Sequence, residues 1–156
     1  MLIMSLEIGH GLLHQIHAHL EAAYPEEGAG LLLGEADGRA RRATAILRLP
    51  NTRQDLVRRN RYMITPQDYL QAEQEAARRG LQVLGVYHSH PDHPSRPSEY
   101  DREWAMPWFV YLITSVRVGG AADSRCWRLS EDRSGFEEEP IEFAVDHIEL
   151  NPEDRS

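Results

Sequence analysis

The 156-residue chain has a single cysteine, Cys126, so it can form neither an intramolecular disulfide nor a metal site of several thiolates. It also lacks an excess of basic charge, because its formal net charge of −8 argues against a nucleic-acid-binding surface. No apolar run approaches the length of about 20 residues that crosses a bilayer. Residues 1–10 have neither the basic nor the apolar segment of a secretory signal. We therefore expect a cytoplasmic protein with neither nucleic acid nor membrane as a partner.

The remaining composition is that of an ordinary globular domain, with 41% hydrophobic and 27% charged residues. The length is sufficient for one full hydrophobic core. The chain contains no internal repeat and no low-complexity segment that would divide it. We expect one domain over residues 1–150 and a polar tail over residues 151–156.

Hydrophobic periodicity predicts helices and strands intermixed along the chain. Residues 8–23 carry one apolar stripe and stop before Pro25, as an amphipathic helix does. Residues 66–79 begin with proline and end before Gly80, which predicts a second helix. A third, short helix is expected over residues 98–105. Strands are expected at 29–34, 42–49, 62–64, 81–90, 108–113, 126–129 and 141–145, with a loop at 51–60 and an acidic turn at 137–139. This order predicts an α/β domain built in layers.

The strand at 81–90 is predicted to be the centre of the sheet. Leu84 and Val86 are expected on the face that also carries His88 and His90, and Val83 and Tyr87 are expected on the other. Apolar residues on both faces indicate a strand that is covered on both sides.

Two histidines end this strand, in the run His-Ser-His-Pro over residues 88–91. Residues two apart in a strand point to the same face, about 6.5–7 Å apart, so His88 and His90 can bind one ion when both are neutral. Asp101 follows His90 by eleven residues, and Ser98 stands one helical turn before Asp101. Two imidazoles and one carboxylate, without a fourth protein ligand, are typical of a zinc ion that keeps one position open for water. The pattern predicts a hydrolytic enzyme.

Each of these features also has a structural explanation. A histidine pair near a strand end is more often solvated or structural than metal-binding, and Ser98-x-x-Asp101 also fits a helix capping box. The two features together, with carboxylates upstream, favour the metal site. Amide hydrolysis requires a carboxylate that moves a proton from water to the leaving amine, and Glu26 and Glu27 are both candidates. A hydroxyl such as that of Ser98 can stabilise the oxyanion.

The residues His88, His90, Ser98 and Asp101 resemble the signature of the JAMM (MPN-plus) zinc isopeptidases, His-x-His-x(10)-Asp with a serine three residues before the aspartate. The prolines at positions 91 and 97 are also in the usual places. The segment 25–34, Pro-Glu-Glu-Gly-Ala-Gly-Leu-Leu-Leu-Gly, resembles the upstream family segment Pro-x-Glu-x-Cys-Gly-Leu-Leu-x-Gly. This alignment selects Glu27 over Glu26. Ala29 stands where the family commonly has cysteine, and this difference affects packing and not the chemistry of the site. The resemblance extends over about residues 7–129.

The resemblance implies a curved mixed β-sheet between helices, similar to that of cytidine deaminases. It implies one zinc ion with a bound water, held by His88, His90 and Asp101, with Glu27 as general base and acid and Ser98 as oxyanion stabiliser. The family cleaves the bond after the C-terminal glycine of ubiquitin or ubiquitin-like proteins, and small bacterial members act on sulfur carriers, in some cases releasing a C-terminal residue or adduct. Because the chain is short, we expect a ubiquitin-like sulfur carrier with a Gly-Gly tail as the substrate, not polyubiquitin.

Two other interpretations remain open. His88-x-His90-x-Asp92-His93 also matches the metal motif of the metallo-β-lactamase fold, although only His147 follows as a further candidate ligand. Alternatively, the domain is an MPN-type binding scaffold without catalysis, which the intact set of five expected residues argues against. His93 is expected at the rim of the loop that follows His90, and the sequence does not assign it a role.

Other histidines and the tryptophans have no predicted catalytic role. His10, His14 and His17 share one side of the first helix and can bind a surface metal, although a solvated polar face is the favoured interpretation. The tryptophans at positions 104, 108 and 127 are expected in the core or near the cleft. The sequence does not determine the oligomeric state or whether residues 51–60 move over the site.

Overall fold

The computed structural model describes residues 4–50 and 64–144. In this part of the chain the elements follow in the order β1 (Ser5–Gly9), α1 (His10–Ala23), β2 (Ala29–Ala36), β3 (Ala40–Arg48), α2 (Pro66–Arg78), β4 (Gln82–Pro91), α3 (Glu99–Trp104), β5 (Val110–Arg117), β6 (Gly120–Leu129), β7 (Phe136–Glu139) and β8 (Ile141–Ala144). All strands belong to one eight-stranded sheet with the order β7-β6-β5-β4-β2-β3-β1-β8. The predicted loop at 51–60, most of the predicted strand at 62–64 and the tail at 151–156 lie outside the described residues.

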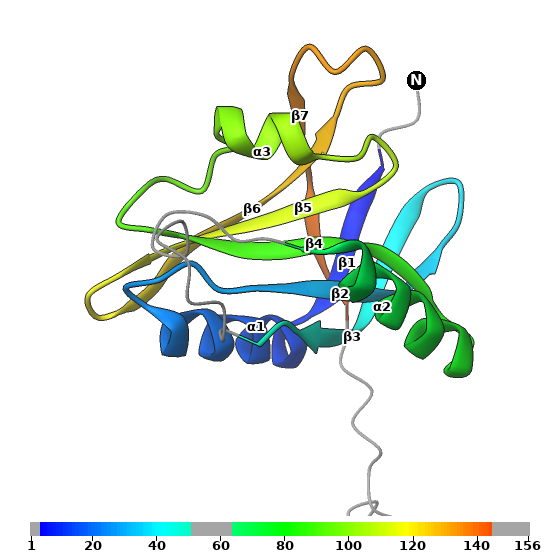
Figure 1. Ribbon diagram of the computed structural model, residues 1–156, viewed down its shortest axis with the longest axis horizontal. Helices are drawn as coiled ribbons and strands as arrows, with labels where there is room; N and C mark the ends of the chain where they lie inside the picture. The colour runs from blue at the N-terminus through cyan, green and yellow to red at the C-terminus, as the bar shows by residue number, and fades with distance from the viewer. Residues whose placement is uncertain (1–3, 51–63, 145–156) are drawn as a thin grey trace, which may run out of the picture.

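The sheet is mixed and strongly curved, with helices on both faces (Figure 1). Strand β1 runs parallel to β3 and β8, β4 runs parallel to β5, and the other neighbours are antiparallel. Helix α1 packs against β1, β3, β4, β5 and β6, whereas α2 packs against β2 and β4 from the opposite side. The predicted curved mixed sheet between helices is confirmed.

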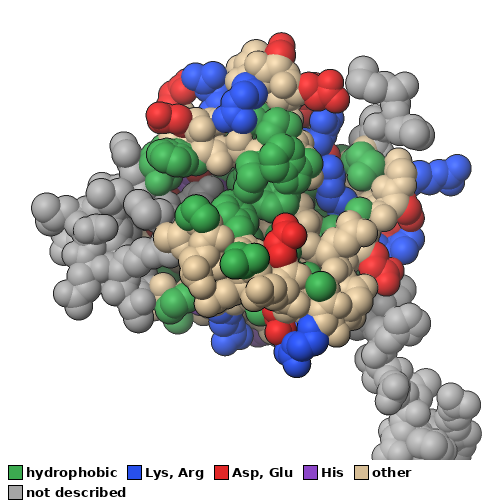
Figure 2. Space-filling model, turned by 45° about the vertical axis from the view of Figure 1, so that its right-hand side comes forward, with side chains coloured by type: hydrophobic (Ala, Val, Ile, Leu, Met, Phe, Trp, Pro, Cys, Tyr) green, Lys and Arg blue, Asp and Glu red, His purple; other side chains and the backbone are tan. Residues whose placement is uncertain are grey.

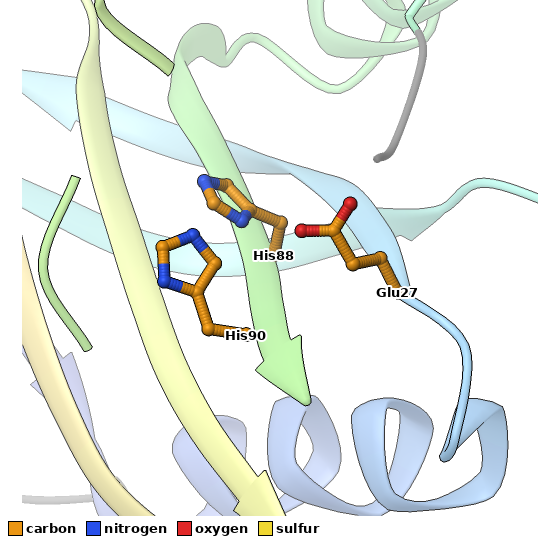
Figure 3. A group of neighbouring side chains, drawn as sticks. All are labelled: Glu27, His88 and His90. Carbon is orange, nitrogen blue, oxygen red and sulfur yellow. The ribbon is translucent and has the colours of Figure 1, made fainter. Parts of the chain in front are cut away.

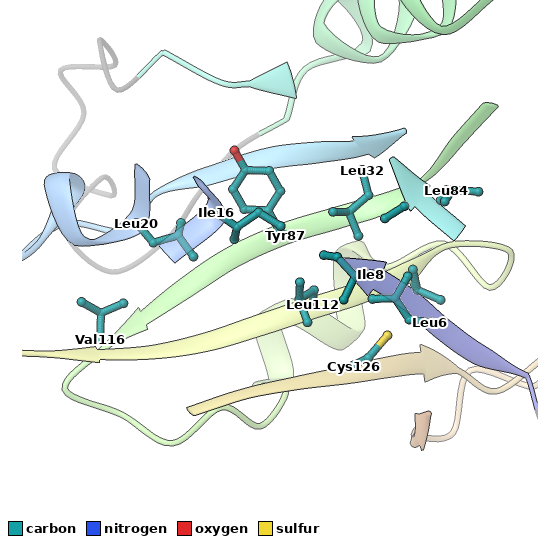
Figure 4. Close-up of a cluster of buried hydrophobic side chains, with 12 residues drawn as sticks. Leu6, Ile8, Ile16, Leu20, Leu32, Leu84, Tyr87, Leu112, Val116 and Cys126 are labelled. Carbon is teal, nitrogen blue, oxygen red and sulfur yellow. The ribbon is translucent and has the colours of Figure 1, made fainter. Parts of the chain in front are cut away.

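Helix α1 packs on one face of the sheet through a cluster of buried apolar side chains (Figure 4). Ile16 and Leu20 of α1 have no exposed surface and lie among side chains of the sheet. Tyr87 of β4 is buried in the same cluster, and its hydroxyl lies 2.7 Å from Nδ1 of His19 on α1. The residue opposite is Gly30, where a Cβ would lie only 2.2 Å from Tyr87 Cζ. A glycine is therefore required at this position of β2 to admit the tyrosine ring.

Helix α2 begins and ends as its sequence predicts. Thr65 precedes it and accepts a hydrogen bond from the Asp68 amide at 3.1 Å, while the Asp68 carboxylate accepts one from the Thr65 amide at 2.8 Å. These two bonds form a capping box and satisfy amides that have no partner within the helix. Gly80 follows the last turn with a φ of +68°, a conformation that favours glycine.

Two strands differ from the prediction. Ile8 was expected in the first helix, but it lies in β1, fully buried between β3 and β8. The strand continues directly into α1, so the apolar residues of the strand extend the helical pattern. The acidic run at 137–139 was expected as a turn, but it belongs to β7. The Glu139 carboxylate is buried there and accepts hydrogen bonds from Arg41 Nη1 at 2.8 Å and Arg128 Nε at 3.0 Å, which compensates its charge.

A bulge in β4 changes one predicted face. Leu33 of β2 pairs with Val83, and the preceding Leu32 pairs with Gly85, so Leu84 is an extra residue on β4. Leu84 therefore packs with Tyr87 on the α1 side, whereas it was expected beside Val86, and Val83 packs against the cluster of Val86, whereas it was expected beside Tyr87. The predictions for Leu84 and Val83 are wrong because strict alternation does not continue through a bulge.

The outer surface carries exposed aromatic side chains. Trp104 is 64% exposed and Trp108 66% exposed, whereas Trp127 is half-buried and donates from Nε1 to the Ser95 carbonyl at 2.9 Å. Figure 2 shows hydrophobic side chains gathered in the middle of one face of the molecule. Among the described residues, the helices are all too short or too polar to span a membrane.

Candidate metal centre

Three segments that are far apart in the sequence meet beside the end of β4. His88 and His90 lie on β4, Glu27 precedes β2, and Asp101 lies in the first turn of α3. Because Ala29 of β2 pairs with His88, the residues before β2 lie next to the histidines. Figure 3 shows the Glu27 carboxylate and the two imidazole rings beside a common space at this end of the sheet. The structure therefore brings the predicted residues together.

The distances within this group suit a single small ion. Nε2 of His88 lies 3.3 Å from Oδ1 of Asp101, and Nε2 of His90 lies 3.1 Å from Oδ2. With metal–ligand bonds of about 2.1 Å, the corners of a tetrahedron lie about 3.4 Å apart. One ligand atom each of Glu27, His88 and His90 also lie within 4.8 Å of one another, and all three residues are buried. The donor set of two imidazoles and nearby carboxylates fits a divalent metal such as zinc.

Burial sets the charge of His88. Complete burial lowers the pKa of His88 to about 4, although the charge of Asp101 opposes the shift, so the imidazole is neutral at pH 7. A neutral imidazole is the form that binds a metal.

The hydrogen bonds of His90 orient its ring toward the common space. Because the Pro94 carbonyl can only accept, Nδ1 of His90 donates to it at 2.9 Å, which directs Nε2 toward Asp101. Burial alone would lower the pKa of His90, but the hydrogen bond to Asp101, the charge of Asp101 and the bond to Pro94 raise it above its ordinary value. Burial would likewise raise the pKa of Asp101, but His88, His90 and the Ser98 amide hold it below its usual range.

The position of Asp101 is compatible with both interpretations of its sequence. Its amide donates to Ser98 Oγ at 3.1 Å, and its carboxylate accepts from the Ser98 amide at 2.7 Å, so the capping box is present. The same carboxylate faces His88 and His90. The cap therefore holds the carboxylate in place beside the imidazoles, and the structural and metal-binding interpretations are compatible.

The sequence did not indicate how the Glu27 segment is held. Ser89 lies between the two histidines and is fully buried. Its Oγ accepts a hydrogen bond from the Gly28 amide at 2.9 Å, and its own amide donates to the Gly28 carbonyl at 3.0 Å. These bonds extend the β2–β4 pairing by one residue and attach the neighbour of Glu27 to the histidine strand. Only the alternation of faces along β4 could have suggested this role.

A cleft of about 580 Å³ opens onto the group. Glu27, His90 and Ser98 line it, together with Pro25, Pro91, Asp92, His93, Pro94, Arg96 and Pro97. At its rim, the Tyr24 hydroxyl donates to the Asp92 carboxylate at 2.9 Å, which connects the Glu27 segment with the loop after β4. The cleft can admit an extended chain that reaches Glu27, His90 and Ser98.

The competing motifs are not assembled in the described residues. Asp92 is exposed and bound to Tyr24, and neither it nor His93 joins the group of convergent ligands found between residues 4–50 and 64–144. The three histidines of α1 likewise form no metal-binding group in those ranges. His10 stacks on Phe143 at 4.1 Å, and Nε2 of the half-buried His17 lies 2.8 Å from Ser124 Oγ.

Comparison with known proteins agrees with this geometry. Residues 10–130 match the model of a family described as prokaryotic homologs of the JAB domain. A probable TtuB-protein conjugate cleaving protease of Thermus thermophilus is 33% identical over 116 residues, which cover 72% of this chain and 74% of that protein. A desampylase of Haloferax volcanii is 36% identical over 92 residues, which cover 58% of this chain and 63% of the relative.

Solved structures agree on the fold. A protein from Salinibacter ruber has 42% identity and a TM-score of 0.71, with 93% of this chain and 95% of that chain covered. A JAB1/MPN domain protein from Archaeoglobus fulgidus has 24% identity and a TM-score of 0.56, with 89% and 99% covered, so it shows the fold alone.

Proposed function

Because this chain belongs to the family of prokaryotic homologues of the JAB domain, we propose that it hydrolyses the amide bond after the C-terminal glycine of a ubiquitin-like sulfur carrier, with one zinc ion as cofactor. The chain is an enzyme of the metallo-isopeptidase class, since the relatives it matches are named as a protease and a desampylase. The single observation that carries the proposal is the convergence of His88, His90 and Asp101 on one space with Glu27 beside it.

His88, His90 and Asp101 are the proposed ligands, because Nε2 of His88 lies 3.3 Å and Nε2 of His90 lies 3.1 Å from an oxygen of the Asp101 carboxylate. When bound, zinc would lower the pKa of a coordinated water to about 7 and polarise the scissile carbonyl. Glu27 then accepts the proton of the attacking water and delivers it to the leaving amine, which is general base followed by general acid catalysis. The Ser98 hydroxyl lines the cleft and donates a hydrogen bond to the oxyanion as it forms.

The shape of the cleft supports a glycine-ending tail as substrate. Proline rings form part of its walls, and Glu27 and Ser98 both line it, so the scissile bond has to enter a space bounded by these rings. Glycines allow the backbone to approach such a surface closely. The names of the relatives support a ubiquitin-like protein as the donor of that tail. A cytoplasmic location is also part of the proposal, since a single cysteine is compatible with a reducing compartment.

The decisive experiment compares two adjacent glutamates. The zinc-loaded protein is incubated with TtuB that carries a peptide extension after its C-terminal glycine, and the products are identified by mass spectrometry. Glu27→Gln should lose turnover by about 10²- to 10⁴-fold, the usual contribution of general acid–base catalysis. It should keep its zinc, because Glu27 is not a proposed ligand. The control Glu26→Gln removes a carboxylate one residue away and should remain active.

Two outcomes contradict the proposal separately. Full activity of Glu27→Gln shows that another group moves the proton. Zinc-loaded wild-type protein that leaves every extended carrier intact refutes the substrate and favours a binding scaffold.

A further inference from the structure

A second cavity adjoins the catalytic cleft and has an unusual charge for this molecule. It encloses about 450 Å³ between the loop after β4, the end of β5 and the start of β6. Its lining includes three arginines, Arg96, Arg117 and Arg125, and one acidic residue, Asp123. The cavity therefore has an excess of two positive charges, whereas the whole chain has a formal net charge of −8. A cavity whose charge is opposite to that of the whole protein can bind a negatively charged ligand.

Among the described residues, two of the three guanidinium groups have neither an ion-pair nor a hydrogen-bond partner. Asp123 already accepts hydrogen bonds from Ser95 Oγ at 2.6 Å and from Arg125 Nε at 3.1 Å. Within residues 4–50 and 64–144, the side chains of Arg96 and Arg117 make neither an ion pair nor a hydrogen bond, and both residues are exposed. They are thus available to an acidic ligand without loss of an existing contact.

The wall between the two cavities is held rigidly. Pro94 and Arg96 line both the cleft and the arginine cavity. The loop that carries them is fixed by hydrogen bonds from Ser115 Oγ to the His93 carbonyl at 2.7 Å and from Trp127 Nε1 to the Ser95 carbonyl at 2.9 Å. A further bond, from His90 to Pro94, fixes the same loop from the cleft side. A preorganised surface loses little conformational freedom when it binds a partner.

From these observations we infer that the arginine cavity is a docking site for acidic side chains on the folded body of the ubiquitin-like substrate. The inference rests on the proposed function, since a tail in the cleft places the rest of its protein against the adjoining wall. Arginine forks bind carboxylates through paired hydrogen bonds. Arg96 comes from the loop after β4 and Arg117 from the end of β5, which suits separate carboxylates on a protein surface. On an otherwise acidic enzyme, the site directs an acidic partner toward the cleft.

The test uses a charge reversal at Arg117, which lines the arginine cavity but not the cleft. Two substrates are compared, the extended TtuB fusion and a short peptide that ends in Gly-Gly joined to a fluorescent amine. Arg117→Glu should raise KM for the TtuB fusion by about tenfold with kcat unchanged, and should leave both constants for the peptide unchanged. The matched control is Arg39→Glu in the exposed β2–β3 turn, at the opposite end of the molecule from the β5–β6 turn (Figure 1). It should alter neither substrate.

Salt provides an independent readout. KM for the TtuB fusion should rise with sodium chloride for the wild type and for Arg39→Glu, because salt screens the attraction, and should respond less for Arg117→Glu. Equal KM values for Arg117→Glu and the wild type, or the same rise for the peptide, would overturn the inference. Inhibition by inorganic phosphate beyond that of sodium chloride at matched ionic strength would also overturn it, since the cavity would then be a small-anion site.

Binding separates this inference from the proposed function. The dissociation constant of TtuB is measured by calorimetry for Glu27→Gln and for Glu27→Gln combined with Arg117→Glu, which requires no turnover. Weaker binding of the double variant supports the docking site even if no fusion is cleaved. Equal binding, or no binding to either protein, refutes it. Cleavage by the wild type with no effect of Arg117→Glu retains the proposed function and removes only the docking site.

Discussion

Substitution of Ser89 by alanine tests whether one hidden hydroxyl positions the proposed general base. Ser89 has no exposed surface, and its Oγ accepts the Gly28 amide at 2.9 Å. Ser89→Ala leaves that amide buried without this partner. A buried donor left unsatisfied costs about 1–3 kcal/mol. The segment has little room to adjust, because the Gly28 backbone lies against α1, where a Cβ would be 3.0 Å from Leu20 Cδ2.

The cost of the unsatisfied Gly28 amide also sets the expected effect of Ser89→Ala on catalysis. Glu27 is the neighbour of Gly28, so a loosened segment no longer holds its carboxylate in place. If the whole 1–3 kcal/mol is lost from the transition state, kcat falls by about 5- to 150-fold. Zinc content should not change, because alternate residues of a strand face opposite sides, and His88 and His90 point away from the Ser89 hydroxyl.

The assay measures kcat on the TtuB fusion, zinc content by mass spectrometry and the free energy of unfolding of the zinc-free protein in urea. Thr114→Val is the matched control. Thr114 is the partner of Ser89 on β5, is fully buried and lies with its Oγ1 2.8 Å from Ser124 Oγ. It should lose about 1 kcal/mol of stability and retain full kcat. Wild-type kcat in Ser89→Ala, or a fall in kcat that is matched by loss of zinc, would refute the reasoning.

Two further predictions concern the pH dependence of zinc binding and the buried ion pairs of Glu139. Protons compete with zinc for both imidazoles, and His90 is protonated before His88, because its pKa is raised whereas burial lowers the pKa of His88 to about 4. Zinc affinity and turnover should therefore decline as pH falls from about 7 to 5, and a flat profile between about pH 5 and 8 would contradict this. Glu139→Gln should lower the free energy of unfolding by about 3–5 kcal/mol, since it removes the buried charge that compensates Arg41 and Arg128. The exposed neighbour provides the control, Glu138→Gln, which should change stability by less than about 1 kcal/mol in urea unfolding.

Local signals in the sequence predicted the elements that end with strong caps. The proline at its start and Gly80 after its end define α2, and the prolines after His90 define the loop that ends β4. These residues restrict their own backbone, so a short window of sequence contains the information. Strand β1 was missed because its identity depends on pairing with β3 and β8, which are remote in the chain. The face of Leu84 was wrong because a bulge depends on the partner strand.

The residues of the candidate site also differ in how far a local sequence pattern predicts them. His88, His90 and Asp101 could be selected from spacing, because a strand and a helical turn fix the relative directions of their side chains. Choosing Glu27 over Glu26 required a family resemblance, since neither periodicity nor charge distinguishes the two residues. The contact of Ser89 with Gly28 joins segments that are 61 residues apart. The alternation of faces along β4 indicates that Ser89 points away from the histidines, but it does not identify Gly28 as the partner of its hydroxyl.

The pairing of β1 with β8 has a consequence for synthesis on the ribosome. Leu6 of β1 pairs with Ile141 of β8, so the outer side of β1 waits for a neighbour that is translated well after the proposed catalytic residues. The proposed catalytic residues are all translated by Asp101. Contacts between such distant positions slow folding. A nascent chain therefore presents its histidines and carboxylates to cellular metal well before its outermost parallel pair can close.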